Sequence, residues 1–217
     1  LAAAVKHDWQ GLESFRQEIR NKLPRYGNDL EGADNMMVRL FDDYTDALAK
    51  TKCADGVFIP AGLSTFGRQL SWREQRMATP DGFKKGAILS GNSSPVPGTA
   101  LKGPTAILMS AGKLDYTKLP NGCALDIYLE PGLLAEENGL QILCALIRGS
   151  LKTGVFLVQV NVVDVAILKK AQAHPEQFFD LTVRVSGWSA RFVSLSRDWQ
   201  DMIIGRLETD GRCTLPP

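Results

Sequence analysis

The second half of the chain alternates apolar β-type segments with helical segments, and this alternation restricts the possible folds more than any other feature of the sequence. β-type runs occupy residues 124–129, 155–163 and 181–186, and helical patterns occupy residues 139–152 and 165–173. Apolar strands separated by single helices are typical of parallel pairing through right-handed crossovers. The sequence therefore predicts an α/β fold with a mainly parallel sheet.

The first half has a different character. Amphipathic helices are predicted over residues 2–22 and 32–50, with Pro24 and Gly27 between them. Residues 57–105 are rich in Gly and Pro but also in apolar residues, so we expect a long folded loop that packs on the body. A final helix is predicted from an N-cap at Ser196 to about residue 208.

Charge and composition exclude several classes of protein. The 217 residues carry a net charge of +1 with both signs interleaved, which argues against a nucleic-acid partner or an anionic membrane surface. No apolar run approaches the roughly 20 residues needed to span a bilayer. We therefore expect a cytoplasmic protein, and because the helical pattern already begins at Leu1 rather than after a Met, we expect the chain to start inside something longer.

The cysteines and histidines do not form a metal-binding pattern. Cys53, Cys123, Cys144 and Cys213 are far apart, and His7 and His174 are not at ligand spacing from them. We expect no metal site in this chain, and we interpret the cysteines as structural residues of a reducing compartment.

Gly187 lies between a β-type run and a second apolar run. A glycine in this position is most often a turn or bulge residue that needs a positive φ. On the preceding predicted strand, Gln159 and Asn161 share one face; they either bond neighbouring loops or take part in catalysis.

The segment Arg184-Val185-Ser186-Gly187-Trp188 resembles the signature of glycyl radical enzymes, in which Arg-Val-(Ser or Ala)-Gly is followed by an aromatic residue near the C-terminus. Two more blocks resemble the pyruvate formate-lyase family of these enzymes. The first comprises 78–82, 98–99, 103–106, 113–115 and 121–122, and the second comprises 158–164 and 174–176.

The resemblance implies a fold and a site. The chain would be the C-terminal half of a ten-stranded α/β barrel, with a helical segment at 1–56, barrel strands and Gly/Pro-rich loops at 57–165, and the glycyl radical domain at 166–217. Gly187 would store the radical at the tip of a buried loop, because a residue without Cβ permits a planar radical and close approach to Cα. The radical loop and the surface recognised by the activating enzyme would comprise Arg184, Val185, Ser186, Trp188 and Ser189.

Individual roles within that loop stay open. Arg184 either pairs with a buried carboxylate or docks on the activating enzyme. The apolar residues around Gly187 either exclude solvent and oxygen or simply form core; they are Val183, Val185, Trp188 and Phe192.

The resemblance also implies partners. A separate activating enzyme with S-adenosylmethionine and an iron–sulfur cluster would install the radical, so this chain binds no cofactor of its own. The radical would pass to an upstream cysteine whose thiyl acts on a small-molecule substrate. We expect a homodimer of the full-length enzyme, and we expect this chain alone to be inactive. No substrate-binding residue is assigned, although residues 59–66 are expected to enter the barrel.

Several functions remain possible at this stage. The sequence around Trp188 resembles the arylacetate decarboxylase or arylsuccinate synthase branch more than true pyruvate formate-lyase. Pyruvate formate-lyase (formate C-acetyltransferase) and a diol dehydratase are the alternatives. An alternative of another class is that the chain is a small stand-alone protein, a spare part that docks on a damaged enzyme and replaces its radical domain. A purely structural α/β domain would make the Gly187 segment a coincidence.

Overall fold

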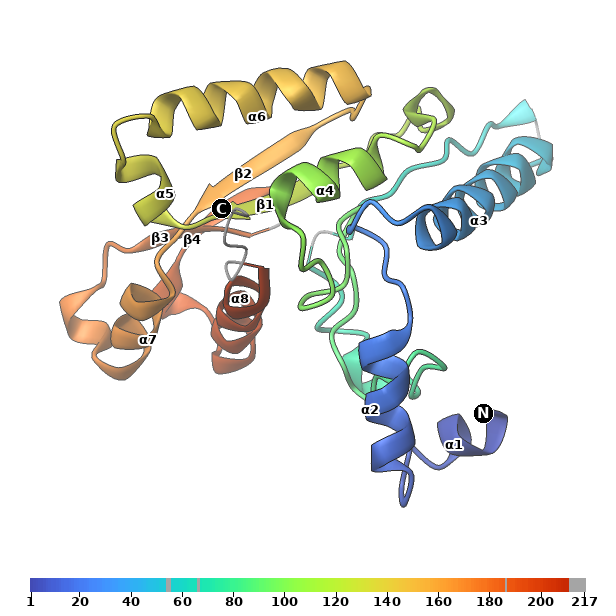
Figure 1. Ribbon diagram of the computed structural model, residues 1–217, viewed down its shortest axis with the longest axis horizontal. Coiled ribbons are helices and arrows are strands. Elements are labelled where there is room, and N and C mark those ends of the chain that lie inside the picture. The colour runs from blue at the N-terminus through green and yellow to red at the C-terminus, as the bar shows by residue number, and fades with distance from the viewer. Residues whose placement is uncertain (54–55, 66, 186, 211–217) are drawn as a thin grey trace.

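The computed structural model describes residues 1–53, 56–65, 67–185 and 187–210 and places helices before a mixed α/β region (Figure 1). The α-helices are α1 (Ala2–Lys6), α2 (Glu13–Lys22), α3 (Glu31–Lys50), α4 (Gly103–Ala111), α5 (Pro131–Ala135), α6 (Gly139–Thr153), α7 (Val165–Ala173) and α8 (Arg197–Asp210). The strands are β1 (Leu125–Leu129), β2 (Val158–Val162), β3 (Thr182–Val185) and β4 (Trp188–Arg191). Short 3-10 helices span Arg73–Gln75, Tyr116–Lys118, Pro175–Gln177 and Phe192–Ser194.

β1 and β2 form a parallel pair, as the strand–helix alternation predicts. Their register runs from Leu125 opposite Val158 to Leu129 opposite Val162, and α5 and α6 make the connection between them. Parallel strands need a crossover of this kind, which the apolar helix α6 supplies.

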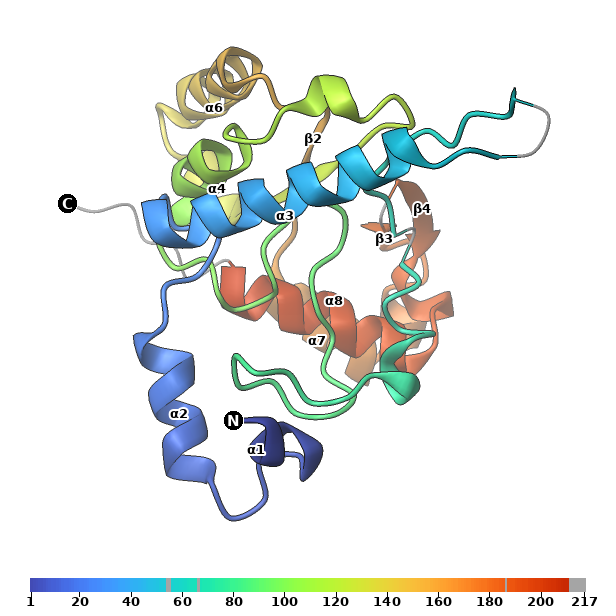
Figure 2. The ribbon, with the colours of Figure 1, turned by 90° about the vertical axis from the view of Figure 1, so that its right-hand side faces the viewer.

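The two faces of this strand pair differ in chemistry. Leu125, Ile127 and Leu129 alternate with polar residues and pack, together with Val158 and Val160, in a core that also contains residues of α3, α4 and α6. Figure 2 shows α4 and α6 on one side of the strands and α7 and α8 on the other. The residues that alternate with the apolar set are Asp126, Tyr128, Gln159 and Asn161.

β3 corrects the expectation of a mainly parallel sheet. It pairs antiparallel with β4, which was not predicted, in a register from Thr182 opposite Arg191 to Val185 opposite Trp188. A turn this short joins antiparallel neighbours directly, so no crossover is possible. The described chain thus contains one parallel pair and one hairpin, and the ten-stranded barrel and its domain boundaries stay predictions.

The helix predicted over residues 2–22 is also wrong in part, because it breaks between α1 and α2. Asp8 and Trp9 adopt positive φ angles of 51° and 61° there. Trp9 is 1% exposed, packs with Ala4 and Ala78, and its Nε1 donates to the carbonyl oxygen of Thr79 at 3.3 Å. Burial of one large indole thus overrides the helical periodicity.

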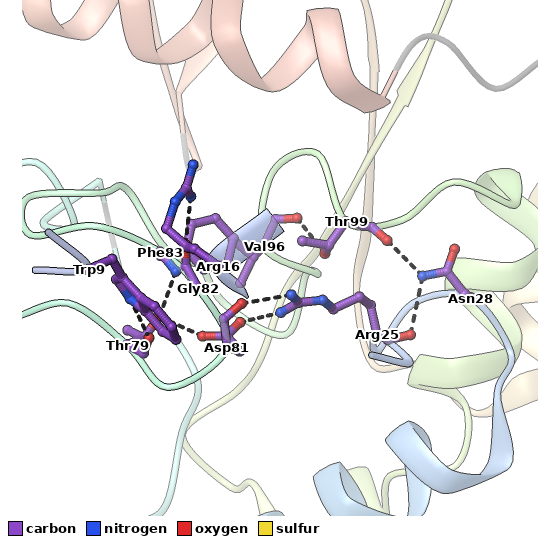
Figure 3. A network of polar contacts seen from close by, with 10 residues as sticks. All are labelled: Trp9, Arg16, Arg25, Asn28, Thr79, Asp81, Gly82, Phe83, Val96 and Thr99. Atoms are coloured by element: carbon purple, nitrogen blue, oxygen red, sulfur yellow. Dashed lines mark hydrogen bonds and ion pairs between the residues drawn. The ribbon is translucent and has the colours of Figure 1, made fainter. Parts of the chain in front are cut away.

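The Gly/Pro-rich loop packs on the body of the protein, as expected. Figure 3 shows the polar contacts that fasten it. The Arg16 guanidinium donates to the carbonyl oxygen of Gly82 at 2.8 Å, and Arg25 forms an ion pair with Asp81. Asn28 donates to the carbonyl oxygen of Thr99 at 2.7 Å. Backbone carbonyls that a loop leaves unpaired are thereby satisfied by α2 and the residues that follow it.

None of the helices in the described ranges combines the length and the apolar content that crossing a membrane requires.

Candidate functional site

The β3–β4 hairpin is fixed to the protein through one face of β3. Val183 and Val185 are buried there, whereas Thr182 and Arg184 are exposed. The buried valines join a second hydrophobic cluster formed with α7 and α8; its buried members are Leu168, Ala171, Val183, Val185, Phe192, Met202, Ile203 and Ile204. The core-packing interpretation therefore holds for Val183, Val185 and Phe192.

Gly187 occupies the turn of this hairpin and is exposed in the described chain. The buried loop expected for it is not seen in the described chain: Val185 at the end of β3 is buried, but no described residue comes within 4 Å of a Cβ built at Gly187. Its φ of +100° is a backbone conformation that L side chains rarely adopt. Backbone conformation, and not crowding, is therefore what requires glycine.

Arg184 links the hairpin to the parallel strand pair. Its Nε donates to Oε1 of Gln159 on β2 at 3.4 Å, and its Nη1 donates to Oγ of Ser189 on β4 at 3.4 Å. Among the described residues these hydrogen bonds go to an amide and a hydroxyl, not to a buried carboxylate. The carboxylate partner that the sequence left open is therefore wrong for the described chain, and docking on another protein stays a prediction.

Arg184, Gln159 and Asn161 form a row of polar side chains, of which the last two lie on β2. Gln159 Nε2 donates to Asn161 Oδ1 at 3.0 Å, and Asn161 is 5% exposed with no partner for its Nδ2. The interpretation that these side chains bond neighbouring segments is confirmed for Gln159. An unpaired buried amide costs free energy, so Asn161 is the one member of the row whose hydrogen bonding is incomplete.

The remaining predicted site residues are spread over the hairpin. Val185 is buried, Ser189 is exposed, and Trp188 keeps 42% of its surface exposed. Ser186 lies outside the described residues. Trp188 meets Trp199 of α8 edge to face, with ring centroids 6.1 Å apart. The sequence analysis did not single out Trp199; an aromatic residue in the first turn of the helix that follows the motif was its only signal.

Among the described cysteines, Cys123 fits the structural interpretation. Cys123 is buried, and burial raises the pKa of its thiol, which disfavours the reactive thiolate. Cys53 and Cys144 are half-buried free thiols, and Cys213 lies outside the described residues. In the ranges described, no three side chains of the metal-binding types His, Cys, Asp and Glu come together.

Residues 59–65 run beside the start of β1. Leu63 forms a parallel bridge with Cys123 and its N–H donates to the carbonyl oxygen of Gly122 at 3.0 Å. Thr65 N–H donates to Asn92 Oδ1 at 3.0 Å. Phe66 lies outside the described residues, and entry of this segment into a barrel stays a prediction.

A cavity of about 220 Å³ lies past the carboxyl ends of β1 and β2, where ligands often bind in α/β folds. Asp164 in its lining already accepts from the backbone N–H groups of Ala166 (2.7 Å) and Ile167 (3.3 Å) as the N-cap of α7. This carboxylate therefore has a structural role.

Comparison with known proteins gives consistent matches. The family described as "Glycine radical" matches residues 89–193, and the family "Pyruvate formate lyase-like" matches residues 1–70. The "Probable dehydratase YbiW" of Escherichia coli is 38% identical over 96% of this chain and 27% of its own length. The indoleacetate decarboxylase of Tractidigestivibacter scatoligenes is 34% identical over 90% of this chain and 22% of its own length.

A solved structure gives the same result for the fold. The glycerol-bound, B12-independent glycerol dehydratase from Clostridium butyricum superposes with a TM-score of 0.89 at 35% identity, over 94% of this chain and 26% of that one. The chain thus spans about a quarter of the length of the relatives it matches. With its Arg-Val-Ser-Gly-Trp hairpin inside the matched segment, the chain belongs to the glycyl radical enzymes of the pyruvate formate-lyase family.

Proposed function

We propose that Gly187 stores the radical of a glycyl radical enzyme. The observation that carries this proposal is its place at the exposed tip of a hairpin, with φ at +100° and open space around the built Cβ position. The same glycine lies in the segment that matches the glycine radical family, residues 89–193. Within the described chain, no atom blocks the approach to this Cα.

The chemistry explains the residue type. Removal of one hydrogen atom from Cα leaves an unpaired electron that the flanking amide nitrogen and carbonyl group share, and the centre becomes planar. The hydrogen atom leaves with the abstracting radical, which a separate activating enzyme with S-adenosylmethionine and an iron–sulfur cluster would supply. Arg184, Trp188 and Ser189 are exposed around the tip and would form the surface that this enzyme recognises, while Val185 beneath them packs in the core.

The stored radical needs protection from solvent and oxygen that the described chain does not provide. The relatives are about four times as long as the part matched here, since the chain covers 27% and 26% of two of them. We assign the cover, the thiyl cysteine that receives the radical and the substrate pocket to sequence beyond this chain. On this proposal the 217 residues alone do not turn over.

Dehydration of a small hydroxylated substrate is the reaction that the relatives support best, because a dehydratase and a glycerol dehydratase match almost the whole chain. Decarboxylation of an arylacetate is the second candidate, supported by the indoleacetate decarboxylase and by Trp188 in the motif. The activated complete protein should release an aldehyde or ketone from small diols in the first case, and carbon dioxide from arylacetates in the second.

The radical assignment has a spectroscopic test. The complete protein, treated without oxygen with its activating enzyme, S-adenosylmethionine and a reductant, should give an electron paramagnetic resonance doublet from the single remaining α-hydrogen. Deuterated glycine should collapse the doublet. Exposure to air should cut the backbone at Gly187 and release a C-terminal piece that begins near Trp188.

Gly187→Ala should abolish the signal and the cleavage. Because φ is positive, this variant should also lose roughly 1–3 kcal/mol of stability. Gly154→Ala is the matched control, since Gly154 has φ +80° and nothing within 4 Å of its built Cβ. It should lose similar stability and keep the radical. A Gly187→Ala protein that still gives the doublet, or cleavage at another residue, would return Gly187 to a turn glycine.

A further inference from the structure

The first turn of α8 reaches two segments that are far apart in the sequence. Ser196 starts the helix with its carbonyl oxygen, which accepts the N–H groups of Trp199 at 3.0 Å and Gln200 at 3.1 Å. The side chains of Asp198, Trp199 and Gln200 then point to different neighbours. One of these neighbours is the β3–β4 hairpin, and the other is a loop more than 120 positions earlier.

That loop comprises residues 61–65 and 67–76 and is named here the Gly67 loop. Gly67 is buried with φ +78°, and a Cβ built on it would lie 2.1 Å from Cη2 and 2.8 Å from Cζ3 of Trp199. The edge of the indole therefore packs directly against the backbone of Gly67. A larger residue at position 67 would occupy the space that the indole fills. Arg73 of the same loop pairs with Asp198 at 3.3 Å.

The same turn holds both ends of β4. Trp199 meets Trp188, the neighbour of Gly187, with ring centroids 6.1 Å apart and ring planes at 73°. Gln200 is 8% exposed, and its Nε2 donates to the carbonyl oxygens of Phe192 at 3.2 Å and Leu195 at 3.1 Å, just past the strand. Edge-to-face aromatic pairs and buried amide bonds both fix orientation.

The Gly67 loop is in turn attached to the parallel strands. Thr65 N–H donates to Asn92 Oδ1, and Asn92 Nδ2 donates at 3.1 Å to Oδ2 of Asp126 on β1. Figure 2 shows residues 60–65 and 67–76 passing beside β4 and α8. A continuous series of contacts therefore runs from β1 through the Gly67 loop and Trp199 to Trp188 and Gly187.

We propose that Trp199 is a positioning residue that couples the Gly67 loop to the hairpin that carries Gly187. The coupling between the loop and the hairpin does not depend on the proposed function. Its effect on the radical does, because that effect requires Gly187 to be the radical site. A displacement of the loop shifts the indole, and the indole shifts the turn next to the radical carbon. By linkage, a change at the hairpin reaches the loop in the same measure.

Hydrogen exchange of the complete protein tests the coupling. Trp199→Leu removes the contacts to Gly67 and Trp188 and should speed exchange at least about fivefold in both the Gly67 loop and residues 182–192. Trp199→Phe keeps an aromatic ring and should fall between Trp199→Leu and the native protein. Trp72→Leu is the control, because Trp72 lies in the same loop with 50% of its surface exposed; it should leave the hairpin unchanged.

The lifetime of the radical in air tests whether the coupling affects Gly187. Trp199→Leu should shorten the lifetime of the doublet in air more than Trp72→Leu does, at temperatures where both variants stay folded. The coupling is overturned if Trp199→Leu speeds exchange in the hairpin or α8 while the Gly67 loop exchanges as in the native protein. Trp199→Leu built into Gly187→Ala separates the two proposals, since this double variant lacks the radical yet should still exchange faster than Gly187→Ala alone in both the Gly67 loop and residues 182–192.

Discussion

The β1–β2 pair and the β3–β4 hairpin bury their strands in different ways. Leu125 and Ile127 of β1 are 0% exposed, and β2 also contributes side chains to the core under α4 and α6. In the hairpin only β3 has buried side chains, whereas three residues of β4 are exposed and the fourth is half-buried. Figure 1 shows the parallel pair beneath α6 and the hairpin between that pair and α7 and α8.

The difference separates stability from chemistry. In the parallel pair Leu125, Ile127 and Leu129 are buried in the core, so substitutions at these positions change the free energy of unfolding. At Gly187 a side chain would meet nothing, so a substitution there acts through backbone conformation and through the radical. On the proposed function, the radical would thus be stored on a residue that contributes little packing in the described chain.

The largest expected effect tests whether the buried side chains of the β1–β2 pair determine the free energy of unfolding. Ile127→Ala removes a fully buried side chain between the strands and the helices, and should lower the free energy of unfolding by about 2–5 kcal/mol. Chemical denaturation of the complete protein measures the loss. Val162→Ala, at a β2 position 43% exposed, should change it by less than about 0.5 kcal/mol.

The electron paramagnetic resonance doublet of the same variants should not follow their loss of stability. Ile127→Ala, while folded, should give the doublet with unchanged coupling, because the core of the parallel pair does not touch Gly187. A changed coupling to the α-hydrogen in this variant would contradict the separation of stability from chemistry.

A smaller effect is expected at Lys113, which joins the N-terminal helices to α4. Its Nζ lies 2.6 Å from Oδ2 of Asp34, which is 0% exposed, and 2.8 Å from Oδ1 of Asp29. Lys113→Met would leave a buried carboxylate without its partner. Because the lysine side chain is 33% exposed, the expected loss is about 1–3 kcal/mol, below that of a fully buried pair.

The loss at Lys113 should depend on pH in a defined direction. Hydrogen bonds that the Lys113 ammonium donates to the carboxylates of Asp29 and Asp34 raise its pKa above the usual 10.5. The stability that this ammonium contributes is therefore present below 10.5 and disappears as pH rises through the raised value. The gap between native protein and Lys113→Met should stay constant between about pH 7 and 9 and shrink above it. A gap that widens in alkali would contradict the ion pair.

The sequence predicts the parallel pair well because its signals are local. The strand at 124–129, the helix at 139–152 and the strand at 155–163 appear as β1, α6 and β2 within a few residues. Each is a periodic apolar pattern with clear ends. The break after α1 was missed because it depends on Trp9 burying against Ala78, a contact 69 positions away that no local pattern encodes.

The sequence names candidate site residues but does not predict how they are arranged. The motif singles out Gly187, yet β4 reads Trp-Ser-Ala-Arg, an alternation of only four residues, which is the shortest length at which this pattern indicates a strand. The partner of Arg184 is Gln159, 25 positions earlier, and only the fold brings them together. Trp199 was not singled out because its contact with Gly67 is visible only in three dimensions.

The smallest effect on stability, and the sharpest test of the comparison, is expected at Arg184. Its two hydrogen bonds are 3.4 Å long and exposed, so Arg184→Gln should change the free energy of unfolding by less than about 1 kcal/mol. Arg191→Gln is the matched control on the same hairpin, since Arg191 faces Asp180 at 3.7 Å and Phe179, not β2. Only Arg184→Gln should reduce the yield of radical per chain.

The way in which Arg184→Gln lowers that yield separates the two roles left to this residue. If Arg184 acts by holding the hairpin against β2, then Gln159→Met, which removes the acceptor and keeps the volume, should reproduce the loss at any concentration of activating enzyme. If Arg184 docks on the activating enzyme, Gln159→Met should have no effect, and more activating enzyme should restore the yield for Arg184→Gln. Equal losses in Arg184→Gln and Arg191→Gln would contradict both roles, because they would reflect only the net charge of the hairpin.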